Sequence, residues 1–431
     1  MKITVHRGAE EIGGNCIELQ SGDSRIILDY GTPLPRIDPA THKSIEVPIS
    51  EAEVAIPGLY ADGNRPPDGL IISHTHQDHY GMLFGRQVNP GMPVYMTEIM
   101  EAIIRITGRM TPGHKEYSVM MEHFHKEKPF TVGAFTLTPY LMDHSASESF
   151  GFLIEAEGKK IIYTGDYREH GHRTHAFQRF LGTDMGKIDL MLTEGTQAGV
   201  ESGPNEKDVM LKIESLMQKK GGTLYVMCSG QNVDLLCSLH GIAARNKRLL
   251  AVDGYVALIL ETLKSVARAQ GITLQIPGLD SESLVVLDTP TMINLRRYYP
   301  RQAKAVSKKL VSWDWARANL DNLIIPVRTY SETWVRENIR NFDKALLVYS
   351  MWEGYKEDLN YKRTLDWFRN CGMEAESAHV SGHAYFSSIR KLVQAKNPAK
   401  IIPIHTEHPE IFQAAFGARV HPLKNGCSLE I

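Results

Sequence analysis

Three histidines and one aspartate fall within six residues of this chain, at His74, His76, Asp78 and His79. They come directly after an apolar run that predicts a buried strand. Imidazole nitrogen and carboxylate oxygen are ligands of borderline divalent cations such as Zn²⁺ and Mn²⁺. In an extended segment residues 74 and 76 share one side, and a bend into the next helix turns residues 78 and 79 toward a second position. One such run can therefore serve two adjacent metal ions.

Two further segments and one late histidine match this chemistry. Asp143-His144-Ser145 follows a predicted strand, and Thr164-Gly165-Asp166 ends another. His405 ends an apolar strand near the end of the chain. An isolated Asp-His or Gly-Asp pair means little, but in this order after the histidine run His144, Asp166 and His405 become candidate ligands.

The elements that must position these side chains change in character along the chain. Residues 1–200 predict mainly strands and hairpins, one of them turning at Glu157-Gly158, with a helix over 97–109. An amphipathic helix over 205–220 is expected to stop at Gly221-Gly222. Beyond it strand and helix alternate, which predicts a parallel sheet of βαβ units. We found no internal repeat or long linker, so the middle segment is interpreted as an insertion into one domain.

The composition is that of an ordinary globular protein. The 431 residues suggest two to three domains, with 42% hydrophobic and 23% charged residues. The sequence has no membrane-spanning run and no apolar segment near its start, so neither a membrane contact nor secretion is expected. Five cysteines without a CxxC pair favour a reducing cytoplasm. A net charge of −2 does not by itself support nucleic-acid binding, although a local basic groove would be enough.

The order of the motifs resembles that of the metallo-β-lactamase hydrolases. It consists of the run 74–79, then Asp143-His144-Ser145, then Thr164-Gly165-Asp166. The segment 381–384, followed by His405, resembles the end of a β-CASP nuclease, and segment 226–232 resembles the start of its inserted domain. The opening segment 8–15 resembles the start of ribonuclease J. The resemblance extends from residue 8 to about residue 408.

This resemblance implies the architecture. An αββα metallo-β-lactamase domain of the α/β class is expected from residues 1–200 and 366–431. An α/β β-CASP domain would be inserted at 201–365, with the active site in the cleft between the two.

The resemblance also implies a site with two divalent metal ions, Zn²⁺ as the first expectation and Mn²⁺ as the alternative. A metal pair can activate a shared water and clamp the phosphate that is cleaved. Asp78 would be catalytic as well as a ligand, and His383, oriented by Glu194, would protonate the leaving oxygen. The alternative for His383 is a loop histidine that caps a helix, and the alternative for Glu194 is a solvated acid at the end of a strand. One metal would take His74, His76 and His144, and the other Asp78, His79 and His405, with Asp166 bridging.

The implied function is hydrolysis of RNA phosphodiester bonds, by 5′→3′ exonuclease or endonuclease action or both, in RNA processing or decay. In this family a histidine in the position of His405 favours RNA over DNA. The loop of Ser381, Gly382, His383 and Ala384 opens a predicted helix, and its free N–H groups would receive a phosphate unless Ser381 simply caps the helix.

A basic stretch is the second candidate contact with single-stranded RNA. Arg296, Arg297 and Arg301 lie among lysines and aromatic residues, a pattern that suits a phosphate track with base stacking. The alternative is a solvated helix face. His170, His172 and His175 have a spacing that fits no single site, and we expect them at the surface or rim.

The chain also departs from ribonuclease J. The segment 350–355 carries Trp352 and Glu353 where the family tends to have a smaller loop rich in Ser and Gly, so we expect the substrate groove to be narrowed or redirected. The C-terminal domain of bacterial members is expected to be missing. Because relatives are often dimers, a homodimer is one expectation. The rival functions are a β-CASP nuclease acting on DNA, a small-molecule hydrolase of the same fold, and an RNA-binding scaffold without activity.

Overall fold

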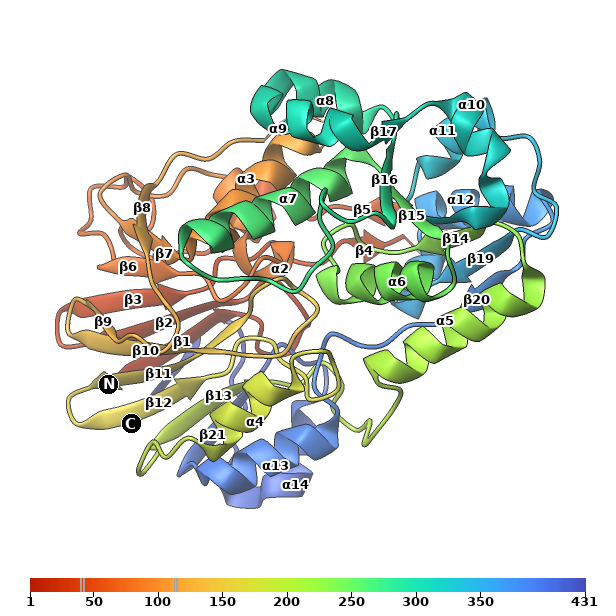
Figure 1. The fold of residues 1–431 in the computed structure, drawn as a ribbon. Helices are drawn as coiled ribbons and strands as arrows, with labels where there is room; N and C mark the ends of the chain where they lie inside the picture. The colour runs from red at the N-terminus through yellow and green to blue at the C-terminus, as the bar shows by residue number, and fades with distance from the viewer. Residues whose placement is uncertain (39–40, 42, 112, 114) are drawn as a thin grey trace.

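The protein is described by a computed structural model that covers residues 1–38, 41, 43–111, 113 and 115–431. Its two ends lie side by side, because β1 pairs with β22 and the Met1 amino group donates to the Ile431 carbonyl (Figure 1). Within these residues, every helix is too short or too polar to cross a membrane.

Two sheets lie face to face in one half of the molecule (Figure 1). The first has the order β22-β1-β2-β3-β6-β7-β8 and the second β21-β13-β12-β11-β10-β9. The first is built from β1 (Lys2–Arg7), β2 (Cys16–Ser21), β3 (Ser24–Leu28), β6 (Gly69–Ile71), β7 (Pro93–Met96), β8 (Met120–His123) and β22 (Cys427–Glu430). The second is built from β9 (Phe130–Val132), β10 (Phe135–Leu141), β11 (Phe150–Ala156), β12 (Lys159–Tyr163), β13 (Leu190–Glu194) and β21 (Lys400–Ile404).

Helices cover the outer faces of both sheets. Ile27 and Leu70 of the first sheet and Phe152 of the second share one buried core between the sheets. The other face of the second sheet packs against α4 (Thr174–Gly182), α13 (Phe386–Lys396) and α14 (Pro409–Phe416). The outer face of the first sheet is covered by α3 (Glu98–Met110). Met100 and Ile104 of this helix belong to the same cluster of buried residues as the strands of the first sheet. The order helix, sheet, sheet, helix confirms the predicted αββα fold.

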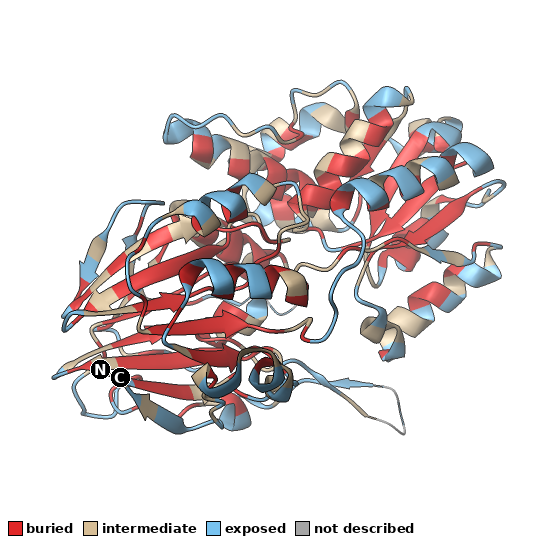
Figure 2. Cartoon of the chain, turned by 90° about the horizontal axis from the view of Figure 1, so that it is seen from below, coloured by how far each residue is buried: buried red, intermediate tan, exposed pale blue. Residues whose placement is uncertain are grey.

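A third sheet of seven strands, paired in parallel, forms the other half of the molecule. Alternate side chains of its strands enter two different cores: Val226 packs with α5, α6 and α7, and Tyr225 with α11 and α12. Burial on both faces explains why the inner strands are apolar throughout, whereas the edge strand β20 (Ala375–Ser377) is partly polar and partly exposed (Figure 2). The strands, in spatial order, are β17 (Leu310–Val311), β16 (Leu284–Leu287), β15 (Leu249–Val252), β18 (Leu323–Val327), β14 (Leu224–Met227), β19 (Leu346–Tyr349) and β20 (Ala375–Ser377).

The remaining helices surround the third sheet, and a few short elements lie near the start of the chain. The helices around it are α5 (Glu206–Lys220), α6 (Val233–Arg245), α7 (Gly254–Ala269), α8 (Thr291–Tyr298), α9 (Pro300–Val306), α10 (Trp313–Ala318), α11 (Ser331–Asn338) and α12 (Leu359–Asn370). Near the start of the chain are β4 (Arg36–Ile37), β5 (Ser44–Ile45), α1 (Ile49–Ala52) and α2 (Gln77–Tyr80).

The limits of α5 follow the sequence closely. Asn205 and Asp208 form a reciprocal capping box at its start, and Gly221 ends it in the left-handed conformation, as predicted. The other end of the middle segment differs from the expectation. Residue 366 falls inside α12, and β20 still pairs with β19 beyond it, so the chain leaves the third sheet only after Ser377.

Candidate metal centre

The candidate ligands gather where strands of the two facing sheets end. His74 follows β6, and Asp166 follows β12. The strands β12, β13 and β21 are parallel neighbours, so their carboxyl ends place Asp166, Glu194 and His405 along one edge. A bridge between His74 and Ser149 brings the first sheet to this edge of the second.

The run 74–79 changes conformation within a few residues. His76 is extended, with φ −89° and ψ 143°, and α2 begins at the next residue. His74 and His76 therefore belong to the extended part, whereas Asp78 and His79 lie in the first helical turn. This is the bend on which the sequence prediction of two metal positions depended.

The structure brings the seven candidate ligands together in groups of three whose ligand atoms lie within 4.8 Å of one another. Asp166 belongs to one group with His74 and His79 and to another with His383 and His405. The Oδ2 atom of Asp166 lies 3.1 Å from His79 Nε2, 3.7 Å from His74 Nε2 and 3.8 Å from His405 Nε2. The two groups that the sequence predicted are His74, His76 and His144, and Asp78, His79 and His405.

These residues fit a divalent cation. The Nε2 atoms of His74, His79 and His405 and both carboxylate oxygens of Asp166 are buried without a hydrogen-bond partner. Unpaired buried polar atoms are costly, and a cation between them would satisfy all five. Burial lowers the pKa of His74 and His144, and lowers that of His76 to about 4. These three imidazoles are therefore neutral at pH 7, the form that binds a metal.

Asp29 holds the ligand loop through hydrogen bonds and was not identified as a functional residue from the sequence. It follows β3 with a φ of +59°, and its carboxylate accepts from the Ser73 N–H at 2.6 Å, the Ser73 hydroxyl at 2.7 Å and His79 Nδ1 at 2.7 Å. The Tyr163 hydroxyl is a fourth donor. An acid that orients a ligand imidazole fixes which nitrogen faces the metal. The signal in the sequence was an aspartate that ends a buried strand.

His383 and Glu194 lie together at the edge of the metal centre. His383 Nδ1 is 3.5 Å from Glu194 Oε2 and 3.6 Å from Asp166 Oδ2. Burial favours the neutral imidazole, but the negative charges of Glu194 and Asp166 outweigh it and raise the pKa of His383 to about 9. A protonated imidazole beside a phosphate can act as a general acid.

The loop of residues 381–384 has a different role from the predicted one. The His383 N–H donates to Ser381 Oγ at 3.1 Å, and the Ala384 N–H donates to Glu194 Oε1 at 2.9 Å. The expectation of free N–H groups is therefore wrong for these two residues. Ser381 does not cap the helix either, because α13 begins at Phe386. The Gly382 carbonyl accepts from His144 Nδ1 at 2.6 Å, so the loop orients a candidate ligand.

Arg168 links this loop to the inserted segment and was also missed. It is fully buried, and its guanidinium donates to the Ser381 carbonyl at 3.1 Å and to Asp234 Oδ2 at 2.6 Å. It also pairs with Glu206 at 3.0 Å and Asp143 at 3.4 Å. One side chain thus joins the loops of His144 and His383 to the first turns of α5 and α6.

The three histidines expected at the rim have different surroundings. His170 is half-buried, stacks on Tyr385 at 4.2 Å between ring centres and contacts the Ser381 carbonyl at 3.0 Å. His172 Nε2 contacts the Ser238 hydroxyl at 2.8 Å, and His175 is exposed.

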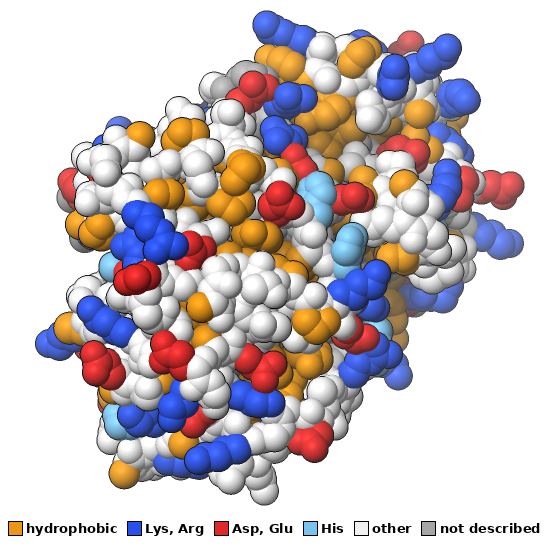
Figure 3. Space-filling model, turned by 90° about the vertical axis from the view of Figure 1, so that its left-hand side faces the viewer, with side chains coloured by type: hydrophobic (Ala, Val, Ile, Leu, Met, Phe, Trp, Pro, Cys, Tyr) orange, Lys and Arg blue, Asp and Glu red, His pale blue; other side chains and the backbone are white. Residues whose placement is uncertain are grey.

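The basic stretch lies on exposed helices outside the metal centre. Arg296 and Arg297 are on α8, and Arg301 is on α9, on the far side of α7 from the two facing sheets (Figure 1). Arg296 pairs with Asp288 at 3.4 Å, and Arg297 covers the ring of Tyr298. On the face shown in Figure 3, Lys and Arg are interspersed with Asp and Glu. No contact between the three arginines and the candidate ligands is present in the described part of the chain.

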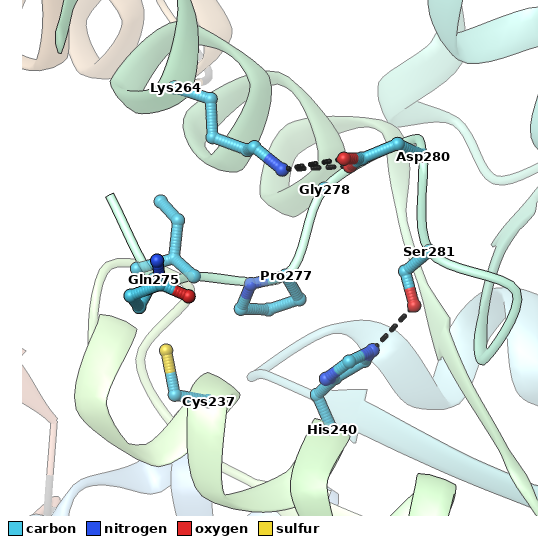
Figure 4. Close-up of a pocket in the computed structure, with 9 residues that line it drawn as sticks. Cys237, His240, Lys264, Gln275, Pro277, Gly278, Asp280 and Ser281 are labelled. Carbon is cyan, nitrogen blue, oxygen red and sulfur yellow. Dashed lines mark hydrogen bonds and ion pairs between the residues drawn. The ribbon is translucent and has the colours of Figure 1, made fainter. Parts of the chain in front are cut away.

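A separate cavity of about 320 Å³ lies between α6, α7 and the segment that follows α7 (Figure 4). It is lined by Cys237 and by polar groups that are already paired: Lys264 with Asp280 at 2.7 Å and His240 with Ser281 at 2.6 Å. None of the predicted site residues lines it. The convergence of unpaired atoms on Asp166 therefore identifies the site better than this cavity does.

Two family models match the chain. One is described as a beta-lactamase superfamily domain and matches residues 39–217; the other is described as a Zn-dependent metallo-hydrolase RNA specificity domain and matches residues 372–419. The first contains His74, His144 and Asp166, and the second contains His383 and His405.

Similar proteins include several ribonucleases. Ribonuclease J of Mycoplasma genitalium is 21% identical over 94% of this chain and 68% of its own length, and ribonuclease J2 of Bacillus subtilis is 21% identical over 95% and 69%. Ribonuclease J of Helicobacter pylori is 25% identical, but over 59% of this chain and only 36% of its own length. A crystal structure of a protein of unknown function from Enterococcus faecalis has a TM-score of 0.73 at 19% identity and covers 99% of both chains. The chain therefore matches the metallo-β-lactamase superfamily over residues 39–217 and resembles the ribonuclease J-like β-CASP proteins over most of its length.

Proposed function

We propose that this protein is a metal-dependent ribonuclease that hydrolyses RNA phosphodiester bonds. The observation that carries the proposal is the position of Asp166, whose Oδ2 atom lies 3.1 to 3.8 Å from the Nε2 atoms of three histidines. Such a carboxylate suits a bridge between two cations. The names of the relatives and the RNA specificity match over residues 372–419 support RNA as the substrate.

The residues divide into two proposed metal positions. When bound, a pair of divalent ions supplies the Lewis acidity and charge neutralisation that phosphodiester hydrolysis needs. We take Zn²⁺ as the native ion and Mn²⁺ as the alternative. The first position is His74, His76 and His144, and the second is Asp78, His79 and His405, with Asp166 shared.

His383 is the proposed general acid. Its Nδ1 atom faces Glu194, which leaves Nε2 for the leaving 3′-oxygen of the substrate. Glu194 is held in turn by the N–H groups of Thr196 and Ala384. Asp78 contributes to catalysis through its position between His79 and His405, at 3.8 and 3.6 Å. The products carry a 5′-phosphate and a 3′-hydroxyl.

The finer assignments rest on the resemblance to ribonuclease J. We propose single-stranded RNA as the substrate, with exonuclease or endonuclease action, a cytoplasmic location and a homodimer. We also propose that residues near 201–365 form the inserted β-CASP domain, whose Asp234 and Glu206 meet Arg168 next to the metal centre. Light scattering during size-exclusion chromatography tests the dimer.

The function is tested by a cleavage assay with Mn²⁺ or Zn²⁺. The substrate is single-stranded RNA labelled at the 3′ end, with either a 5′-monophosphate or a 5′-hydroxyl, beside DNA of matching sequence. We expect RNA to be cut and His76→Ala to be inactive. The matched control is His125→Ala, because His125 is exposed and outside the ligand groups. Cleavage of DNA alone would favour the rival nuclease, and full activity of His76→Ala would remove the metal site.

A further inference from the structure

The loop that follows β19 exposes a tryptophan. Trp352 lies after β19, just before a short 3₁₀ turn (Glu353–Glu357), and 56% of its surface is exposed. Tyr355, in the turn, is half-buried. An exposed tryptophan offers a large, flat apolar face on which a planar ligand can stack.

The aromatic side chains of this loop are held in place. The Trp352 ring lies against Gly354, where no Cβ would fit. Tyr355 meets the Trp352 ring edge-on at 5.4 Å and 88°, and stacks on Tyr361 at 5.2 Å and 8°. The Trp352 carbonyl accepts from the Tyr349 hydroxyl at 2.9 Å and the Tyr355 N–H at 3.1 Å. Because the group is already ordered, binding a planar ligand would cost little conformational entropy.

Two hydrogen bonds place this loop beside the segment that leads to His383. The Ala378 N–H donates to the Tyr349 carbonyl at 2.9 Å, and the Ser377 hydroxyl donates to Glu353 at 2.7 Å. The loop thus lies along the segment that leads to His383.

The charges in the loop are balanced. Glu353 pairs with Lys356 at 2.6 Å, and its side chain is 58% exposed. Because the two charges cancel, the described residues of this loop offer no unpaired cation for a phosphate, and a neutral nucleobase can stack on the neighbouring ring.

We propose that Trp352, supported by Tyr355, is a stacking platform for one nucleobase of single-stranded RNA that passes along the segment leading to His383. This inference rests on the proposed function and names a substrate-binding subsite for it. Stacking on an indole accepts every base, so the platform adds affinity without selecting a sequence.

The test separates stacking from catalysis. Affinity for a short fluorescent single-stranded RNA is measured by anisotropy in Ca²⁺ buffer, for the wild type, Trp352→Ala and Trp352→Phe. The metal content of the three proteins is measured by elemental analysis. We expect Trp352→Ala to weaken RNA binding about 5- to 150-fold, Trp352→Phe to retain most of the affinity, and all three proteins to bind the same amount of metal. Trp315→Ala, on α10, is the matched control and should bind RNA normally.

Two results would overturn the platform. One is an RNA affinity of Trp352→Ala equal to that of the wild type. The other is that Trp352→Ala loses as much affinity for RNA without bases as it loses for normal RNA. The proposed function fails separately. A wild type that binds RNA through Trp352 but does not cleave it with Mn²⁺ or Zn²⁺ would retain the platform and remove the nuclease assignment.

Discussion

His79 Nδ1 donates a hydrogen bond to Asp29 Oδ2 at 2.7 Å, although the two residues are 50 positions apart in the chain. Asp29 also accepts from Ser73 and Tyr163, so one carboxylate fixes the ligand loop against the second sheet. Outer carboxylates of this kind are typically responsible for a 10- to 100-fold change in metal affinity.

Asp29→Ala is therefore expected to lower metal affinity about 10- to 100-fold. Competition with a chromophoric chelator measures it, and Asp23→Ala in an exposed turn is the control. Equal affinity of the two variants would show that Asp29 only stabilises the fold.

His383→Ala is expected to slow cleavage by about 10²–10⁴ while the metal content stays unchanged. The physical reason is that His383 lies beside Glu194 and supplies a proton without being needed to hold the ions. Single-turnover kinetics and elemental analysis of the same preparation measure the two quantities. Loss of metal from this variant would instead assign His383 to the ligands, since it also lies within 3.6 Å of Asp166.

Arg168→Met is expected to lower the free energy of unfolding by about 3–5 kcal/mol, because it leaves Asp143, Glu206 and Asp234 without their buried cation. Arg390→Ala, which removes an exposed pair with Glu201, should cost no more than about 1 kcal/mol. Denaturant titration of the metal-loaded proteins compares them. Equal losses would mean that the Arg168 cluster contributes no more than a surface ion pair.

Replacement of Arg296, Arg297 and Arg301 by Ala is expected to weaken RNA binding and to flatten its dependence on salt. Each lost phosphate contact should reduce the slope of log K against log salt by about 0.7 for a single strand. Anisotropy titrations at several salt concentrations give the slope. Because Arg296 is already paired with Asp288, its share should be the smallest. An unchanged slope would leave the stretch as a solvated helix face.

The features that could be predicted from the sequence depend on residues close together in the chain. The run from His74 to His79 supplies four donors within six residues, and the strand before it and helix after it bend them toward two positions. The ends of α5 were predictable for the same reason, since Asn205 and Gly221 act on the backbone next to them. The residues quoted for the family resemblance predicted the αββα fold.

Tertiary structure alone decided how distant segments support the site. Asp29 and Arg168 resemble ordinary strand-end and loop residues in the sequence, because their partners lie between 25 and 213 positions away. Likewise, the Ala384 N–H donates to Glu194, which lies 190 positions earlier in the chain. Hydrophobic periodicity and capping report the local backbone, whereas pairing of strand ends across two sheets depends on the packed core. The sequence therefore determined which groups are present for metal and proton chemistry, and packing decided how they are oriented and which of them remain open to a substrate.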